Sequence, residues 1–152
     1  NNSIIDCKIT FNDGYAIRAL NSNIVERNKI YFARIGGIDL SDFNIIKGNI
    51  VERTNTNQDI NGAGIIVDTD NRVIENLLEN NRGAGIRIID NGNTLIGNEV
   101  FGTQSVSNID VNGYTFLSSF NAWRNNIGRA NVGGNVSTIQ PPASRSLNNW
   151  MY

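Results

Sequence analysis

Residues 81–92, NRGAGIRIIDNG, contain a Gly-Ala-Gly-Ile tetrapeptide that already occurs within residues 61–71, NGAGIIVDTDN. The isoleucines that end the two tetrapeptides, Ile65 and Ile86, are 21 residues apart. A glycine-rich tetrapeptide that recurs once is compatible with a phosphate loop, a hairpin turn or chance, whereas a regular period indicates a repeat architecture. We therefore compared the rest of the chain with these two segments.

Short apolar segments recur along most of the chain. One set begins at Ile17, Ile38, Ile65, Ile86 and Ile109, with steps of 21, 27, 21 and 23 residues. A second set lies between these segments and consists of paired short strands, each pair hinged on one small or amide residue: Cys7, Asn28, Gly48, Asn76 and Asn98. One repeat therefore contains three strands of about three to five residues joined by three bends.

A period of this length indicates a solenoid, either of leucine-rich repeats or a parallel β-helix. The chain has 27 Asn and 22 Ile, and this composition favours the β-helix, because isoleucine suits strands while asparagine suits turns and disfavours helices. In such a solenoid the coils stack at a strand spacing of about 4.8 Å. Isoleucine and valine then fill the interior, and amides at one bend can form an Asn ladder along the axis.

The pattern of Gly-Ile-x-aliphatic, an Asn-bearing turn, Ile, a hinge amide and another aliphatic resembles the right-handed parallel β-helix of the pectin-lyase-like superfamily over about residues 2–127. The resemblance implies that the Gly-Ile strands form the first sheet, whose outer face binds sugar, and that the hinge amides lie between the second and third sheets. This superfamily includes polysaccharide lyases, hydrolases, epimerases, phage tail spikes and non-catalytic members, so the resemblance predicts the fold better than the function.

The predicted fold class is all-β: a solenoid of about five to six coils over residues 1–127, with a C-terminal tail or cap over residues 128–152. Gly37, Gly64 and Gly85 enter first-sheet strands, where we expect backbone freedom or close approach of coils to require glycine. A phosphate loop is excluded because no Lys-Ser/Thr follows and no helix begins. The 27-residue step is longer than the others because about six residues, TNTNQD at 54–59, are inserted before the first-sheet strand. Insertions in solenoids often lie on the binding face.

Composition excludes several classes of function. The net charge is −1 and the basic residues are scattered, which argues against a nucleic-acid partner. No apolar run is long enough to span a membrane. The chain has no histidine, which removes the usual general base and the usual zinc ligand, and its one cysteine, Cys7, is expected to be a free thiol. We predict no cofactor and no metal site; a bound Ca²⁺ is compatible with the carboxylates but has no support in the sequence.

The middle residue of each first-sheet strand should point outward. Successive coils then present Arg18, Asp39, Ile66, Arg87 and Asp110 in one row. The simplest interpretation is ion pairing between coils, of Arg18 with Asp39 and of Arg87 with Asp110. The alternative is a sugar site, for which the candidate binding residues are Asp39, Asp59, Ile66, Asp68, Asp70, Arg87 and Asp110.

Glycoside hydrolysis needs two carboxylates about 5 to 9.5 Å apart, and a lyase needs a base such as Arg87 near a neutralised uronate. The candidate catalytic residues are therefore Asp39, Asp68 and Arg87. The catalytic motifs of the superfamily do not transfer. Polygalacturonase-like members typically carry an Asp-Asp pair, Gly-His-Gly and Arg-x-Lys, whereas Arg87-Ile88 is followed here by Ile89 and histidine does not occur. The sequence leaves open whether the protein is an enzyme.

Three functions follow from these residues. We favour a polysaccharide-recognising β-helix segment of a larger extracellular, cell-surface or virion-associated protein, whose N-terminal coils precede Asn1. The second is a catalytic polysaccharide lyase or glycoside hydrolase. The third is a structural shaft or trimerisation segment of a phage tail spike, for which a homotrimer is expected.

Overall fold

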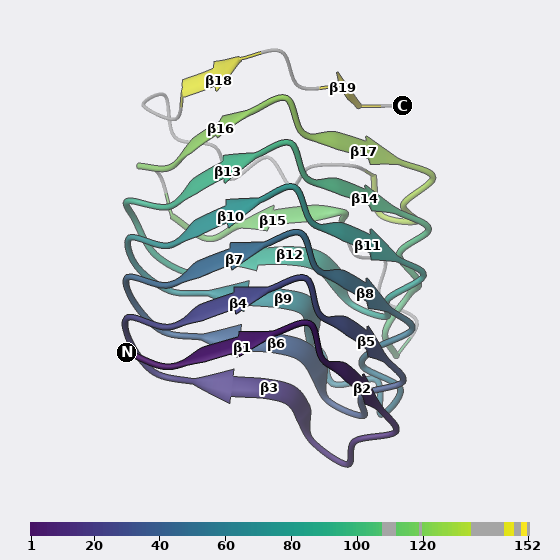
Figure 1. The fold of residues 1–152 in the computed structure, drawn as a ribbon. Helices are drawn as coiled ribbons and strands as arrows, with labels where there is room; N and C mark the ends of the chain where they lie inside the picture. The colour runs from purple at the N-terminus through teal and green to yellow at the C-terminus, as the bar shows by residue number, and fades with distance from the viewer. Residues whose placement is uncertain (108–111, 119, 135–144, 148–149, 152) are drawn as a thin grey trace.

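A computed structural model of the chain describes residues 1–107, 112–118, 120–134, 145–147 and 150–151. Every regular element in this part of the chain is a β-strand, and all paired strands run parallel in three sheets. Figure 1 shows the chain winding through the three sheets in turn, with β1 to β3 at one end of the stack and β18 and β19 at the other. The protein is a parallel β-helix, as the repeat predicts.

Each coil contributes at most one described strand to each of the three sheets. The first sheet contains β3 (Tyr15–Ala19), β6 (Gly36–Leu40), β9 (Ala63–Val67), β12 (Ala84–Ile88) and β15 (Tyr114–Phe116). The second contains β1 (Ser3–Ile5), β4 (Ile24–Glu26), β7 (Ile45–Lys47), β10 (Arg72–Ile74), β13 (Thr94–Ile96), β16 (Ala122–Arg124) and β18 (Arg145–Leu147). The third contains β2 (Lys8–Thr10), β5 (Lys29–Tyr31), β8 (Ile50–Glu52), β11 (Leu77–Glu79), β14 (Glu99–Phe101), β17 (Ile127–Arg129) and β19 (Trp150–Met151). Five coils thus contribute a described strand to all three sheets.

The register confirms the first four members of the predicted first-sheet series and corrects the fifth. Ile17 pairs with Ile38, Ile38 with Ile65, and Ile65 with Ile86. The next partner of Ile86 is Tyr114, so the last step is 28 residues rather than 23. The error arose because Ile109-Asp110-Val111 matches the aliphatic pattern, whereas the strand uses aromatic residues in the same inward positions. Residues 108–111 lie outside the described part of the chain.

The core consists of stacks of inward aliphatic side chains, one column for each inward strand position. In the third sheet, for example, Ile30, Val51, Leu78 and Val100 are all fully buried. Toward the C-terminal coils the columns end in larger side chains: Tyr114, Phe116 and Trp123, with the rings of Phe116 and Trp123 at 5.4 Å. Alternation of inward and outward residues therefore has the period of two that a strand requires.

Hydrogen bonds between hinge amides confirm the Asn ladder between the second and third sheets. In each step the Oδ1 of one asparagine accepts a hydrogen bond from the backbone N–H of the equivalent residue in the preceding coil. The accepting residues are Asn28, Asn49, Asn76, Asn98 and Asn126, and the N–H of Cys7 is the donor to Asn28 at the N-terminal end. The predicted member Gly48 is wrong, since the ladder residue of that coil is Asn49. Gly48 instead occupies the preceding position, which is left-handed (φ +63°) and is filled by Asp6, Arg27 and Glu75 in other coils.

A second ladder, which the sequence analysis missed, lies at the bend between the first and second sheets. Its members are Asn23, Asn44, Asn71, Asn93 and Asn121, each accepting from the backbone N–H of the preceding coil's equivalent residue at 2.8–3.2 Å. All five are buried. The signal was present, because an asparagine directly precedes each second-sheet strand from β4 to β16. These two ladders explain much of the asparagine excess.

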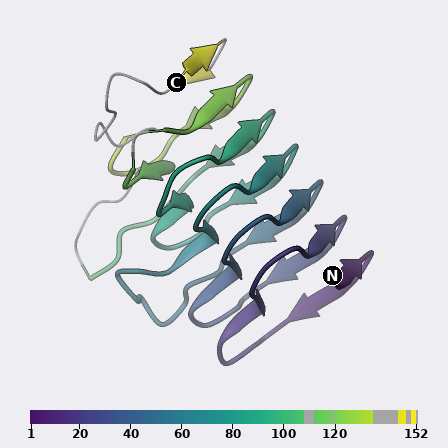
Figure 2. The same cartoon turned by 90° about the vertical axis from the view of Figure 1, so that its left-hand side faces the viewer.

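Two departures from the regular coil have different outcomes. The N–H of Thr54 donates to Oδ1 of Asn81, so Thr54 still belongs to the regular coil. The insertion therefore begins after Thr54, and its predicted start at residue 54 is one residue early. Figure 2 shows the connection from β8 to β9 extending beyond those of the neighbouring coils.

At the C-terminus, β18 and β19 pair in parallel with β16 and β17 and extend the second and third sheets. The division into coils up to residue 127 and a cap from residue 128 stays a prediction.

Candidate functional site

The outer face of the first sheet carries a hollow of about 600 Å³. Four adjacent strands contribute its floor: Arg18 from β3, Asp39 from β6, Ile66 from β9 and Arg87 from β12. These residues are outward-facing and occupy equivalent positions, because Arg18 pairs with Asp39, Asp39 with Ile66, and Ile66 with Arg87 in the parallel register. The structure therefore confirms the predicted outward row of side chains from Arg18 to Arg87.

One of the two predicted ion pairs is present. Nε of Arg18 lies 3.0 Å from Oδ2 of Asp39, and the guanidinium also lies 5.4 Å above the ring of Tyr15. The Arg18 side chain is 74% exposed, so solvent screens this pair and its contribution to stability is under about 1 kcal/mol. The residue next to Arg87 in the following coil is Thr115, not Asp110. Asp110 itself lies outside the described residues.

Ile66 points outward but is not solvent-exposed, which corrects the expectation of an open apolar contact. Its exposed fraction is 4%, and it packs in a small outer cluster with Ala63 and Ala84 against which Tyr15 also lies. The physical reason is that these neighbours pack around the Ile66 side chain and exclude water from it. Ile66 therefore forms the apolar floor of the hollow rather than a projecting surface.

Arg87 is the most constrained charged group in the hollow. One guanidinium nitrogen, Nη1, donates to the carbonyl oxygen of Ile60 in the insertion at 3.4 Å. Nε is buried, and no described residue accepts a hydrogen bond from it. A buried donor without a partner is costly, about 1–3 kcal/mol. An oxygen of a bound ligand could relieve that cost.

The pKa values of two carboxyls in the hollow are raised above their ordinary value. Burial raises the pKa of Asp39, the Arg18 cation opposes this, and the negative charge of Asp68 raises it further. Burial also raises the pKa of Asp68, as do the charges of Asp42 and Asp90. The phenol pKa of Tyr15 is raised by burial and by the charges of Asp39 and Asp59. The hollow therefore combines two carboxyl groups of raised pKa with two guanidinium groups.

Four of the seven predicted binding residues line this hollow: Asp39, Ile66, Asp68 and Arg87. The three candidate catalytic residues are among these four. Asp59 belongs to the insertion, where its Oδ1 accepts from the N–H of Asn61, and Asp70 is exposed at the following turn with φ +54°. Neither lines the hollow. That any of these residues binds or acts on a ligand stays a prediction.

Tyr15, Ser41 and Asn61 line the hollow and were not predicted. Tyr15 lies two residues before the inward Ile17, so the strand period alone predicts an inward side chain, whereas its ring lies beside the Arg18 guanidinium and lines the hollow. Ser41 and Asn61 lie in turns, where the period gives no direction. No group of three or more His, Cys, Asp or Glu side chains within the described segments is placed to hold a metal ion. The predicted absence of a cofactor stays a prediction.

The fold and the outer-face hollow define a solenoid of the parallel β-helix class. Residues 1–101 match the model of the family described as right handed beta helix region, and the chain belongs to this family. The resemblance to the pectin-lyase-like β-helix is therefore confirmed for the fold. That the chain is a C-terminal segment stays a prediction.

Among solved structures, a double mutant of the periplasmic alginate epimerase AlgG is similar in fold, with a TM-score of 0.58 and 14% sequence identity. The alignment covers 99% of this chain and 47% of that one, so the chain spans about half the length of the epimerase structure. None of the curated proteins matches the chain at a significant level. The described residues include no helix that could cross a membrane.

Proposed function

We propose that the hollow on the first sheet binds a polysaccharide, and that the chain is the glycan-recognising β-helix of a larger protein outside the cytoplasm, on a cell surface or on a virion. One observation supports this most strongly: Nε of Arg87 is buried and no described residue accepts its hydrogen bond, and the same side chain lines a hollow of about 600 Å³ that also contains Asp39, Asp68 and Tyr15. The insertion that holds Arg87 through Ile60 lies at the same level of the solenoid.

The chemistry of the hollow suits a sugar. Hydroxyl groups both donate and accept hydrogen bonds, so they can pair with carboxyls in either protonation state and with guanidinium groups. Ile66 at the floor offers a small apolar contact for a ring face. A guanidinium with a free donor favours an acceptor that carries negative charge, such as a uronate carboxylate, through a charge-assisted hydrogen bond. We therefore expect acidic glycans to bind more tightly than neutral ones.

A binding screen tests this proposal. The chain is titrated with hexagalacturonate and with neutral maltohexaose, and the backbone amides of β6, β9 and β12 are followed by NMR. Arg87→Gln removes the guanidinium but keeps a hydrogen-bonding amide, and should weaken hexagalacturonate binding by about tenfold or more, since a charged hydrogen bond contributes roughly 1.5–3 kcal/mol. Arg72→Gln, on the outer face of the second sheet, is the matched control. Equal binding by both variants would remove the hollow as the site.

A catalytic role is the second candidate, and the raised carboxyl pKa values of Asp39 and Asp68 favour it, because carboxyls with perturbed pKa values cluster at catalytic sites. A protonated carboxyl beside a charged one is the arrangement that glycoside hydrolysis uses. The test is release of unsaturated or reducing ends from acidic polysaccharides by the parent chain and by Asp39→Asn. Turnover that persists in Asp39→Asn and in Asp68→Asn would exclude this mechanism.

A further inference from the structure

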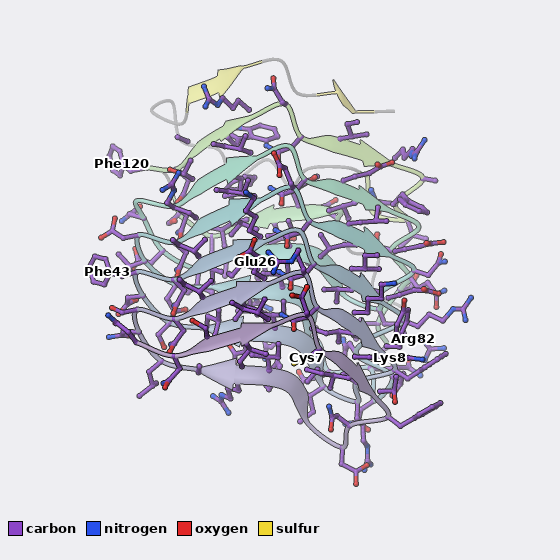
Figure 3. All side chains as sticks on the ribbon, in the orientation of Figure 1. Cys7, Lys8, Glu26, Phe43, Arg82 and Phe120 are labelled. Atoms are coloured by element: carbon purple, nitrogen blue, oxygen red, sulfur yellow. The ribbon has the colours of Figure 1, made fainter. Side chains whose placement is uncertain are left out.

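A second surface with features of a ligand site lies on the third sheet, away from the first-sheet hollow. It consists of Lys8, Thr10 and Phe11 from the first coil and Lys29, Tyr31 and Phe32 from the second, and we call it the aromatic–cationic patch. These six residues line a hollow of about 430 Å³. Figure 3 shows Lys8 on the same side of the solenoid as Arg82, and Phe43 and Phe120 projecting on the opposite side.

The patch is ordered in three rows by the strand register. Lys8 pairs with Lys29 and Thr10 with Tyr31, so two ammonium groups and two hydroxyls face outward from adjacent strands. Phe11 and Phe32 follow at the ends of the strands. Successive outward rows are about 6.6 Å apart along a strand, and the coils about 4.8 Å apart across it. The result is a small surface with cations on one side, hydroxyls in the middle and aromatic rings on the other.

The two lysines are an unfavourable pair for the fold alone. Like charges directly opposite on a sheet are destabilising. Among the described residues, no carboxylate forms an ion pair with Lys8 or Lys29, whereas Arg18, Arg27, Arg34, Arg53 and Arg129 all have one. In the next two coils the lysine position is taken by Ile50 and Leu77. At this strand position the positive charge is therefore confined to these two coils, and an anion would neutralise it.

The two phenylalanines occupy a position that favours other residues. The residue after each third-sheet strand from β2 to β17 is left-handed, with φ +56° at Phe11 and +57° at Phe32, and the later coils place Arg53, Asn80, Gly102 and Ala130 there. A bulky side chain at positive φ is an outlier, so the backbone at these two positions is strained. The rings stack with centroids 5.0 Å apart and planes within 5°, and Arg53 lies 5.7 Å over Phe32. Phe11 remains 77% exposed, so burial does not repay the strain at that residue.

From unpaired adjacent cations, outward hydroxyls and a strained, exposed aromatic stack, we propose that the aromatic–cationic patch is a second carbohydrate-binding site, selective for acidic oligosaccharides. The lysines bind the carboxylate or sulfate of one residue. The hydroxyls of Thr10 and Tyr31 bind its ring substituents, and the face of a pyranose ring packs on the phenylalanines. Glu52 and Glu79, which continue the hydroxyl row in the next two coils, end the site by repelling anions. This inference is independent of the function proposed for the first sheet.

The experiment uses the same NMR titration of the full chain with hexagalacturonate and follows the amides of β2 and β5. The double variant Lys8→Gln/Lys29→Gln should weaken this binding event by at least tenfold. Phe11→Asn should weaken it several-fold, because asparagine tolerates the left-handed backbone and only the ring is lost. Lys47→Gln, an exposed lysine on the outer face of the second sheet, is the control and should bind as the parent does.

Arg87→Gln should leave the shifts of β2 and β5 unchanged, so that failure at one site is distinguished from failure at the other. Hexathymidylate serves as a polyanion without pyranose rings, and maltohexaose as a neutral sugar; both should bind this patch more weakly than hexagalacturonate. The proposal is overturned if hexagalacturonate leaves the β2 and β5 amides unshifted. It is equally overturned if hexathymidylate binds as tightly with no dependence on Phe11, which would make the patch a general polyanion surface.

Discussion

Nδ2 of Asn49 donates a hydrogen bond to Oδ1 of Asn76 at 2.9 Å, and the same oxygen accepts the backbone N–H of Asn49, also at 2.9 Å. Asn76 repeats both bonds with Oδ1 of Asn98 at 3.0 Å, and its Nδ2 also donates to the carbonyl oxygen of Ile46 at 2.9 Å. Each hinge amide thus accepts a hydrogen bond from a backbone N–H at the bend, where no strand pairing provides an acceptor. At this corner of the solenoid, hydrogen bonds between hinge residues join successive coils in place of strand pairing.

Replacing Asn76 with leucine should destabilise the whole stack. The substitution leaves the N–H and amide of Asn49, the Oδ1 of Asn98 and the carbonyl of Ile46 without this partner in a buried corner. Unpaired buried groups cost about 1–3 kcal/mol each, so we expect a loss of roughly 3 kcal/mol or more. For a chain of this length the melting temperature should fall by about 6–12 °C. Asn57→Leu, at an exposed position of the insertion, is the control, and an equal melting temperature for both variants would contradict the ladder's role.

Gly64 should not tolerate alanine. A Cβ there would lie 2.7 Å from the carbonyl oxygen of Gly85 and 2.7 Å from Cδ2 of Leu78, and the backbone contact cannot yield cheaply. The requirement is close approach between coils, not a left-handed backbone. We expect Gly64→Ala to cost about 1–3 kcal/mol, the usual range for overpacking a core. Gly14→Ala is the matched control, because no atom lies within 4 Å of its Cβ position. Equal chemical-denaturation midpoints for the two variants would refute the steric explanation.

Ile66→Asp should destabilise the protein, contrary to what an outward position alone suggests. The side chain is 4% exposed and packs with Ala63 and Ala84, so the substitution removes this apolar packing and buries a carboxylate between Asp39 and Arg87 of the neighbouring strands. Truncation of a buried isoleucine costs about 2–5 kcal/mol, and the desolvation of a buried ion pair with Arg87 offsets most of its Coulombic gain. Ile66→Val should cost about 1 kcal/mol. A thermal melt of Ile66→Asp that matches the parent would show that the cluster is open to solvent. Glycan binding by this variant is interpretable only where it remains folded.

The repeat predicted the fold because each coil repeats the same physical requirement, an inward aliphatic at alternate positions and an amide at a bend. Residues that lie on strands inherit their direction from this period, which is why Asp39 and Arg87 were placed correctly in one row. The prediction was wrong where the requirement is met by a different residue type, as at Tyr114 in place of Ile109. The period predicts which way a side chain points but not how far it is buried, so it could not show that Ile66 packs with Ala63 and Ala84 and is 4% exposed.

Turn residues were the least predictable part of the candidate site. Asp59 and Asp70 were chosen because carboxylates near the insertion suit sugar chemistry, yet neither lines the hollow. The repeat that aligns Cys7 with Asn28 also places Lys8 beside Lys29, but it did not indicate that a hollow lies beside this pair.

The first-sheet carboxyls should make the protein less stable as pH rises through their titration. Burial first, and then the charges of Asp42 and Asp90, raise the folded-state pKa of Asp68 above the ordinary value of 3.8. Between these two values the folded state binds more protons than the unfolded state, so the free energy of unfolding falls with increasing pH and becomes level once the folded-state carboxyl has ionised. The same sign holds for Asp39, where burial is again the largest cause. Chemical denaturation at a series of pH values from about 3 to 7 measures the slope.

Asp68→Asn should reduce this slope, and it should also move the titration of the Asp39 carboxyl, followed by NMR, to lower pH. The physical reason is that the charge of Asp68 raises the pKa of Asp39, so its removal leaves burial opposed only by the Arg18 cation. The double variant Asp39→Asn/Asp68→Asn should consequently change the slope by an amount that differs from the sum of the two single changes, because the carboxyls are coupled. Strictly additive slopes, together with an Asp39 titration that Asp68→Asn leaves in place, would show that the two carboxyls do not share one electrostatic environment.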